Sequence, residues 1–297
     1  MKNGSIRFAI ILAAISCAFC LLLPVHSQNN LDVKVSKDVL YERIGDVSEA
    51  MDIYQPAQTE GVLPAVILFH GGGWSAGDKS DFTTLAEGLA RAGYVAFNVN
   101  YRLATAEGNK YPAQLDDVQT AVRWVRAHAK QYDINPNKLG ALGASAGGHL
   151  VALLGTMDTR DNSDKALAKY SSRVDCVVDF FGPTDFAPKG LKTYSPLVMG
   201  ILLNFFGKTP KEAPALYREA SPVYHINSKT VPFLIFQGTS DPLVPYSQSV
   251  ELYKDLKAKH IEAKLVLFKG EGHGFSKPED NQTALQDTLA FFAKHLR

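Results

Sequence analysis

Short apolar runs and stretches of helical period alternate along most of this chain. Runs typical of buried strands occupy residues 65–70, 95–99, 139–142, 174–181, 233–236 and 265–268. Around them, apolar residues recur at three- and four-residue spacing, which predicts helices over residues 81–92, 112–132, 146–154, 247–259 and 283–296. Strands that alternate with helices of this length require crossover connections, so we expect a mostly parallel sheet with helices on both faces.

Two segments depart from this rhythm. Residues 31–55 alternate apolar and polar side chains, which predicts an antiparallel edge before the main sheet. Residues 186–222 carry proline, glycine and lysine around an apolar patch at 198–206, and we expect an insertion over the carboxyl edge of the sheet. The predicted fold class is therefore α/β, with one domain over residues 28–297.

The chain begins with the features of an export signal. Basic residues precede an apolar stretch at 8–23, and cleavage after Ser27 would leave Gln28 as the new N-terminus. The alternatives are an uncleaved membrane anchor and, more weakly supported, a lipoprotein attached through Cys17. We favour export, which predicts a secreted or periplasmic protein with no membrane contact after cleavage.

Composition narrows the functional classes. The 297 residues are 46% hydrophobic and 21% charged, enough apolar material for one large domain. The net charge of +1 comes with no basic stripe, which argues against nucleic-acid binding. Cys17 and Cys20 lie in the predicted signal, so the mature chain would keep only Cys176 and could form no internal disulfide. Cys176 lies in an apolar run, which predicts an inert core residue.

The pentapeptide at residues 143–147, GASAG, carries the strongest chemical signal. It places Ser145 on a tight turn between a predicted strand and a predicted helix, the pattern of a nucleophile elbow. Glycine two positions before and after the serine avoids the clash that a Cβ would make. The hydroxyl of Ser145 would then stand as the nucleophile, with the amide of Ala146 facing a developing oxyanion. The alternative is a glycine-rich helix start that only packs closely.

A serine nucleophile needs a base and an acid. His273 lies in a glycine-flanked loop after the last predicted strand, and Asp241 lies in a turn after the strand at 233–236. The order Ser145, Asp241, His273 is the one expected of a hydrolase with a nucleophile elbow. Asp185 is the competing acid, and the alternatives for the pair are a surface histidine and a turn-forming aspartate.

Three consecutive glycines follow His70 at the end of a predicted strand. Such a run costs chain entropy, which is accepted where a backbone must approach another group closely. The amides of Gly72 and Gly73, with that of Ala146, are candidates for an oxyanion hole. A phosphate-binding loop is the rival, but the required Lys-Ser/Thr pair and the G-x-G-x-x-G spacing are missing. The Cys-x-x-Cys at residues 17–20 lies in the predicted signal, and the predicted mature chain contains neither this spacing nor His-Glu-x-x-His, so we expect no metal and no cofactor.

Further motifs join these sites in a family resemblance. The full set is HGGGW at 70–74, NYRL at 100–103, YPA at 111–113 with DD at 116–117, GASAGG at 143–148, DP at 241–242 and GHGF at 272–275. Over essentially the whole mature chain these motifs resemble an α/β-hydrolase. The most similar branches are the carbohydrate-esterase and feruloyl-esterase-like group and its neighbour, the hormone-sensitive-lipase-like esterases.

The resemblance implies a role for each site residue. Ser145 would be the nucleophile, His273 the general base and acid, and Asp241 the group that orients His273. Gly72, Gly73 and Ala146 would form the oxyanion hole, and His70 would brace the glycine loop. The chain lacks the long helical N-terminal cap of the lipase-like branch, which favours an open site for an ester carried on a sugar.

The sequence therefore predicts a secreted serine carboxylester hydrolase acting on a small-molecule or polysaccharide ester. The expected substrate is an acetyl or feruloyl ester of a plant polysaccharide. The alternatives are a small-ester carboxylesterase or lipase-like esterase, a prolyl-oligopeptidase-type peptidase, and a non-catalytic binding protein with the hydrolase fold. Trp74 and Tyr101 are candidates to line the substrate groove, with core packing as the other interpretation.

Overall fold

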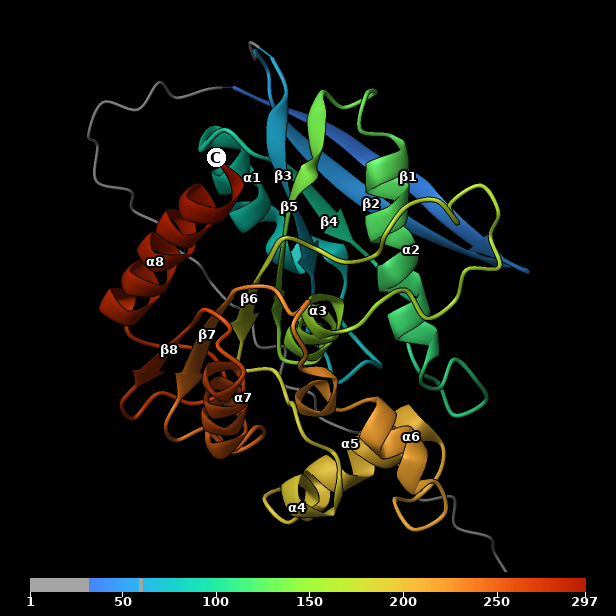
Figure 1. Cartoon of the computed structure of the whole chain (residues 1–297), viewed down its shortest axis with the longest axis vertical. Helices are drawn as coiled ribbons and strands as arrows, with labels where there is room; N and C mark the ends of the chain where they lie inside the picture. Colours follow the sequence, from blue (N-terminus) through green and yellow to red (C-terminus); the bar gives the residue numbers. More distant parts are fainter. Residues whose placement is uncertain (1–31, 59–60) are drawn as a thin grey trace, which may run out of the picture.

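The molecule is built on one eight-stranded sheet, shown in Figure 1. The computed structural model describes residues 32–58 and 61–297, so the predicted signal at 1–27 lies outside the described residues. The strands follow the spatial order β1-β2-β4-β3-β5-β6-β7-β8. Their bounds are β1 Val33–Ile44, β2 Val47–Pro56, β3 Leu63–Phe69, β4 Val95–Val99, β5 Ile134–Ala144, β6 Cys176–Phe180, β7 Phe233–Gly238 and β8 Ala263–Phe268.

The strand directions agree with the sequence pattern. β1 and β2 form an antiparallel pair, and β2 joins the remaining strands by antiparallel pairing with β4. The strands from β3 to β8 all pair in parallel. The predicted antiparallel edge and mostly parallel sheet are therefore confirmed, and the carboxyl ends of six parallel strands meet at one edge.

In the described part of the chain, five helices pack against the sheet at the places where the period predicted them. Their bounds are α1 Thr83–Arg91, α2 Ala113–Ala127, α3 Ala146–Thr156, α7 Ser247–Ala258 and α8 Pro278–Leu296. A short 3-10 helix, η1 Lys79–Phe82, leads into α1. In the described ranges 32–58 and 61–297, no helix combines the length and the apolar character that crossing a membrane requires.

Two helix boundaries differ from the prediction by five residues, and the others by two at most. Helix α2 ends at Ala127 instead of residue 132, because the following residues turn back toward β5 and Asp133 adopts a φ of 50°. Helix α8 begins at Pro278 instead of residue 283. Proline is well suited to a first helical position, and Glu279 and Asp280 place negative charge near the helix N-terminus.

The alternation along β3 divides the core into two layers. Val66 and Leu68 pack with residues of α1 and α8 on one face of the sheet. Ala65, Ile67 and Phe69 pack with residues of α2, α3 and α7 on the other. Because successive side chains of a strand point to opposite faces, a strand covered on both sides must be apolar throughout, as β3 is.

Residues 186–222 lie between β6 and β7 and contain several short helices. These are α4 Pro188–Leu191, α5 Pro196–Phe206, α6 Pro214–Glu219 and the start of the 3-10 helix η2 Pro222–His225. Figure 1 shows α4, α5 and α6 gathered at one end of the molecule. A Cβ built on Gly73 would lie 3.1 Å from Cγ2 of Ile201, so α5 packs over the loop that leaves the carboxyl end of β3.

Candidate active site

Ser145 lies on a strained turn between β5 and α3. Its φ of 56° and ψ of −117° lie in a region that non-glycine residues rarely occupy. The Ser145 amide donates to the carbonyl of Phe180 at 2.8 Å, and the Ser145 carbonyl accepts from the amide of His149 at 3.0 Å. The turn is thus fixed both to the neighbouring strand and to the first turn of α3.

The flanking glycines are required by close backbone packing. A Cβ on Gly143 would lie 2.3 Å from the carbonyl oxygen of Gly147, and a Cβ on Gly147 would lie 2.0 Å from that of Phe69. Either contact is shorter than atoms can approach without displacing backbone. The G-x-S-x-G spacing therefore lets helix α3 start directly against the ends of β3 and β5.

His273 connects Ser145 to an aspartate. Its Nε2 lies 2.8 Å from Oγ of Ser145, and its Nδ1 lies 2.8 Å from Oδ2 of Asp241. The carboxylate accepts only, so Nδ1 carries the proton and Nε2 is free to accept the hydroxyl proton of Ser145. The side chain of His273 is 7% exposed and that of Asp241 is fully buried, which keeps water from competing for these contacts.

Asp241 is held in one orientation by four hydrogen bonds. Oδ1 accepts from the amides of Leu243 and Val244 at 2.8 and 2.9 Å, and Oδ2 accepts from Nε2 of Gln237 at 3.0 Å and from His273. A buried carboxylate is tolerated when its oxygens are satisfied in this way. The arrangement points Oδ2 at His273 and fixes the imidazole.

The structure places the competing acid elsewhere. Oδ1 of Asp185 accepts from the amide of Ala187 at 2.8 Å, and the Asp185 amide donates to Gln248. Burial raises the pKa of Asp185 above its ordinary value. Among the described residues Asp241, and not Asp185, is the aspartate that contacts His273.

Two residues that the sequence did not single out hold the His273 loop. Glu271 is buried and accepts from the amide of Ser276 at 2.5 Å, while its carbonyl accepts from the amide of Ser240 beside Asp241. The Phe181 ring lies 4.7 Å from that of His273, on a backbone with a φ of 45°. The sequence could have indicated Glu271, because it lies in the same glycine-flanked loop as His273. No sequence pattern indicated Phe181, since only the fold brings it to His273.

The glycine loop after β3 lies against the serine. A Cβ on Gly71 would lie 3.3 Å from Cβ of Ser145. Gly72 and Gly73 have φ values of 106° and 58°, and within residues 32–58 and 61–297 their amides donate no hydrogen bond. Ala146 is the first residue of α3, so its amide has no intrahelical acceptor. Each of the three predicted oxyanion donors therefore has an unengaged amide, in a segment that directly adjoins Ser145 or continues from Gly71.

His70 lies at the base of this loop. Its Nδ1 donates to the carbonyl of Gly71 at 2.8 Å, and its ring stacks on Tyr101 with centroids 4.3 Å apart. The hydroxyl of Tyr101 donates to the carbonyl of His70 at 2.9 Å. This position agrees with the bracing role that the family resemblance implied for His70.

For Trp74 and Tyr101 the structure favours core packing over the substrate-groove interpretation. Tyr101 is 2% exposed beneath His70, and Trp74 is 3% exposed with its indole stacked on Phe205 of α5 at 4.1 Å. Burying a large aromatic side chain removes apolar surface from water and stabilises the fold. Both side chains support the site from within the core.

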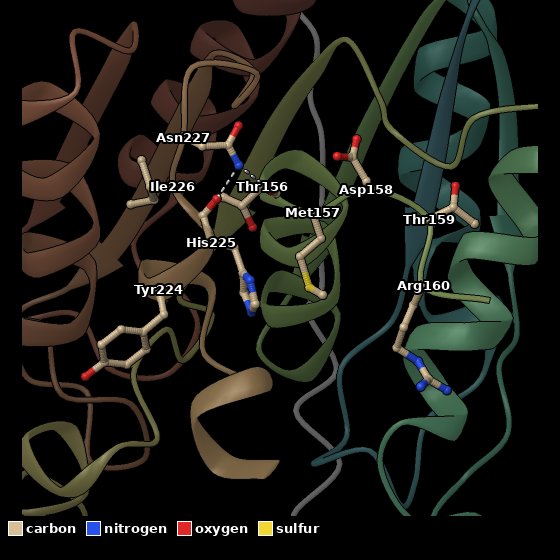
Figure 2. Close-up of a pocket in the computed structure, with 9 residues that line it drawn as sticks. All are labelled: Thr156, Met157, Asp158, Thr159, Arg160, Tyr224, His225, Ile226 and Asn227. Atoms are coloured by element: carbon tan, nitrogen blue, oxygen red, sulfur yellow. Dashed lines mark hydrogen bonds between the residues drawn. The ribbon is translucent and has the colours of Figure 1, made fainter. Parts of the chain in front are cut away.

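A separate pocket lies at the opposite end of helix α3. It has a volume of about 480 Å³ and is lined by residues 156–160 and 224–227, as Figure 2 shows. The eleven residues of α3 span about 16 Å, which separates this pocket from Ser145. Its polar groups pair with protein atoms: Asn227 donates to the carbonyls of Thr156 and His225, and Arg160 pairs with Asp116.

The assembled groups define one kind of chemistry. A hydroxyl bonded to an imidazole, an orienting carboxylate and nearby free amides are the parts needed for covalent acyl transfer. In the described part of the chain, no three His, Cys, Asp or Glu side chains cluster in a way that could hold a metal ion.

Comparison with known proteins finds esterases and also peptidases, among them a dipeptidyl aminopeptidase of Pseudoxanthomonas mexicana that is 30% identical over 82% of this chain and covered to 35% of its own length. The BD-FAE family model matches residues 51–256. The chain is 30% identical over 216 residues to the probable carboxylic ester hydrolase LipM of Mycobacterium tuberculosis, covering 71% of this chain and 49% of LipM. It is 28% identical to an acetylxylan esterase of Xylanibacter ruminicola, covering 71% of this chain and 41% of that enzyme. The chain thus spans about half or less of these curated relatives.

Solved structures extend the likeness over nearly the whole fold. A truncated carbohydrate esterase from gut microbiota superposes with a TM-score of 0.77 at 27% identity. The match covers 91% of this chain and 98% of that one. The similarity therefore extends over most of the fold.

Proposed function

Because the chain belongs to the BD-FAE family of α/β-hydrolases, we propose that it is a serine carboxylester hydrolase acting on esters carried by carbohydrates. The observation that carries the proposal is the unbroken hydrogen-bonded series Asp241, His273, Ser145, with both contacts at 2.8 Å. The esterase relatives and the carbohydrate esterase structure support the same reaction class.

The contacts define the order of proton transfers. Nε2 of His273 takes the proton of Ser145 as Oγ attacks the ester carbonyl carbon, and Asp241 stabilises the imidazolium that forms. The imidazolium then protonates the departing alcohol, leaving an acyl group on Ser145. Water activated by the same histidine attacks this acyl-enzyme, and the released proton returns to Oγ.

The glycine loop and the helix start supply charge stabilisation. The amides of Gly72, Gly73 and Ala146 would donate to the carbonyl oxygen once it becomes an anion. They are already fixed by the backbone, so little reorganisation is needed at the moment of reaction. Loss of one such donor typically costs about 3–4 kcal/mol of transition-state stabilisation.

The substrate we propose is an acetyl or feruloyl ester on a plant polysaccharide. Support comes from the similarity to an acetylxylan esterase and to a carbohydrate esterase. We also propose that the protein is exported through residues 1–27, which would bring it to polymers that cannot enter a cell. A small-ester carboxylesterase and a peptidase of the prolyl-oligopeptidase type are the alternatives that an experiment must separate.

The test is hydrolysis of three esters by the protein beginning at Gln28 and by its Ser145→Ala variant. The esters are 4-nitrophenyl acetate, methyl ferulate and acetylated xylan. Serine-dependent release from xylan or ferulate is expected and would identify the acyl group. Turnover of 4-nitrophenyl acetate alone would reduce the proposal to a small-ester carboxylesterase, and cleavage of a proline-containing peptide without ester hydrolysis would replace it with a peptidase.

Two further variants test the assignment of the acid. Asp241→Asn should lower kcat by about 10³- to 10⁴-fold, because an amide no longer holds the required tautomer of His273. Asp185→Asn should leave kcat within about threefold of the parent, since Asp185 does not contact His273. The reverse result would move the acid to Asp185.

A further inference from the structure

Trp74 is fixed in an unusual conformation directly after the glycine loop. Its φ of 59° lies in the left-handed region, which is costly for a bulky side chain. The ring stacks on Phe205, and the carbonyl of Trp74 accepts from the amide of Ala104 at 2.7 Å. A residue in this conformation persists only where several contacts hold it there.

The indole of Trp74 is bonded to the helix that begins at the nucleophile. Its Nε1 donates to Nδ1 of His149 at 3.2 Å, in a contact buried from solvent. The amide of His149 in turn donates to the carbonyl of Ser145 at 3.0 Å. The hydrogen bond between Trp74 and His149 therefore joins the end of the glycine loop to the first turn of helix α3, which follows Ser145.

His149 has both ring nitrogens engaged. While Nδ1 accepts from Trp74, Nε2 donates to the carbonyl of Ala220 at 2.7 Å, just beyond α6. These bonds require a neutral ring with its proton on Nε2. Burial lowers the pKa of His149 to about 4, so the ring keeps this form at neutral pH. The acceptor for Trp74 is therefore present at neutral pH.

The glycine loop needs an anchor of this kind. Glycine has the widest conformational freedom of any residue, yet an oxyanion donor must be held within about 0.5 Å of its working position. On one side the loop is held by His70, stacked on Tyr101. After the three glycines, Trp74 is the first residue with a side chain that could hold the other end of the loop.

We propose that Trp74 and His149 are positioning residues for the oxyanion hole. Their hydrogen bond fixes the amides of Gly72 and Gly73 relative to Ser145, and the bond to Ala220 ties the same unit to the insertion between β6 and β7. This inference rests on the proposed function, since it assigns the two residues to that reaction.

The variant Trp74→Phe removes the donor and keeps an aromatic ring on Phe205. We expect kcat on 4-nitrophenyl acetate to fall about tenfold, with KM changed less than about twofold, because the loss falls on the transition state. Active sites are counted by complete inactivation with diethyl 4-nitrophenyl phosphate, so that misfolded protein does not enter kcat. The matched control is Tyr111→Phe. Its ring packs 5.5 Å from Phe205, and among the described residues its hydroxyl has no partner.

A second readout separates positioning from general destabilisation. Phenylboronic acid forms a tetrahedral anion on a reactive serine, so its inhibition constant should rise in Trp74→Phe by the same factor as kcat falls. His149→Leu should reproduce both effects, and the double variant should be no worse than either single variant, because all three lack the same bond. His149→Gln retains an acceptor and a donor and should keep more of kcat than His149→Leu.

Three outcomes decide the matter. Trp74→Phe within about twofold of Tyr111→Phe in kcat and in boronate affinity overturns the inference. Multiplicative losses in the double variant also overturn it, since they mean that the residues act separately. A parent protein without serine-dependent ester hydrolysis contradicts the proposed function, and this failure is visible before any variant is compared.

Discussion

At the scale of single residues, Asp179 shows how the elbow constrains its surroundings. It lies on β6 opposite Gly143 of β5, fully buried, and Oδ1 accepts from the amide of Gly182 at 2.9 Å. A Cβ on Gly148 would lie 2.4 Å from the same oxygen, so α3 leaves no room for solvent there. Burial raises the pKa of Asp179 to about 7.

This raised pKa predicts a pH-dependent stability. In the unfolded chain the carboxyl loses its proton near its ordinary value of about 3.9, whereas in the folded protein it keeps the proton to about pH 7. Asp179 therefore lowers the free energy of unfolding progressively as pH rises from about 4 to about 7, by at most about 1.4 kcal/mol per pH unit. Asp179→Asn should remove this contribution in urea denaturation at pH 5, 6, 7 and 8.

The control is Asp46→Asn, at an exposed aspartate in the turn between β1 and β2. It should keep the pH slope of the parent. An Asp179→Asn protein whose unfolding free energy falls with pH as steeply as the parent's would show that Asp179 is ionised in the fold.

At the scale of elements, the position of α3 depends on the absence of side chains at its start. A Cβ on Gly147 would meet the carbonyl oxygens of Phe69 and His70 at 2.0 and 2.6 Å. These atoms belong to the end of β3 and to the base of the glycine loop. The close contact of Gly147 with these two carbonyl groups therefore lets helix α3 begin here, and it also sets the distance between Ser145 and the predicted oxyanion amides.

We expect Gly147→Ala to lower kcat at least about a hundredfold, since backbone must move at both Ser145 and the glycine loop. The melting temperature should fall as well. Gly88→Ala is the matched control, because Gly88 lies within α1 and a Cβ there would meet no atom within 4 Å. That variant should keep its activity and gain about 0.5–1 kcal/mol from improved helix propensity. Full activity in Gly147→Ala would contradict the close packing.

At the scale of the whole molecule, the parallel sheet assembles the site. Ser145 and His273 are 128 positions apart in the chain, yet the ends of β5 and β8 bring them to 2.8 Å. Asp241 follows β7, and the glycine loop follows β3. Because parallel strands end at a common edge, groups that follow four different strands meet there.

The export proposal also belongs to this scale. Expression of the full chain in a bacterium with a standard secretion pathway should yield protein outside the cytoplasm whose N-terminal sequence begins at Gln28. Replacing Ile11, Ile15 and Phe19 with Asp should retain the protein in the cytoplasm, because no apolar run longer than four residues would remain between residues 8 and 23. An exported protein that keeps residues 1–27 would instead support the anchor alternative.

The strand and helix positions were accessible from the sequence because they follow from local periodicity. The nucleophile elbow was also predictable, because its small residues avoid steric clashes within the five positions 143–147. The order of Ser145, Asp241 and His273 limited the acid to two candidates. Helix ends were less accessible, since α2 and α8 differ from the prediction by five residues each, where turn geometry and a first-turn proline decide.

Only the tertiary structure could decide what depends on contacts between distant segments. Asp185 and Asp241 both follow buried strands, and the hydrogen bonds around Asp241 select between them. The burial of Trp74 required α5, and the bond to His149 required α3 to start where it does. Sequence by itself determined the residue types and their local turns, because these depend on neighbours in the chain. Orientation and burial depended on packing across the sheet, which no local pattern encodes.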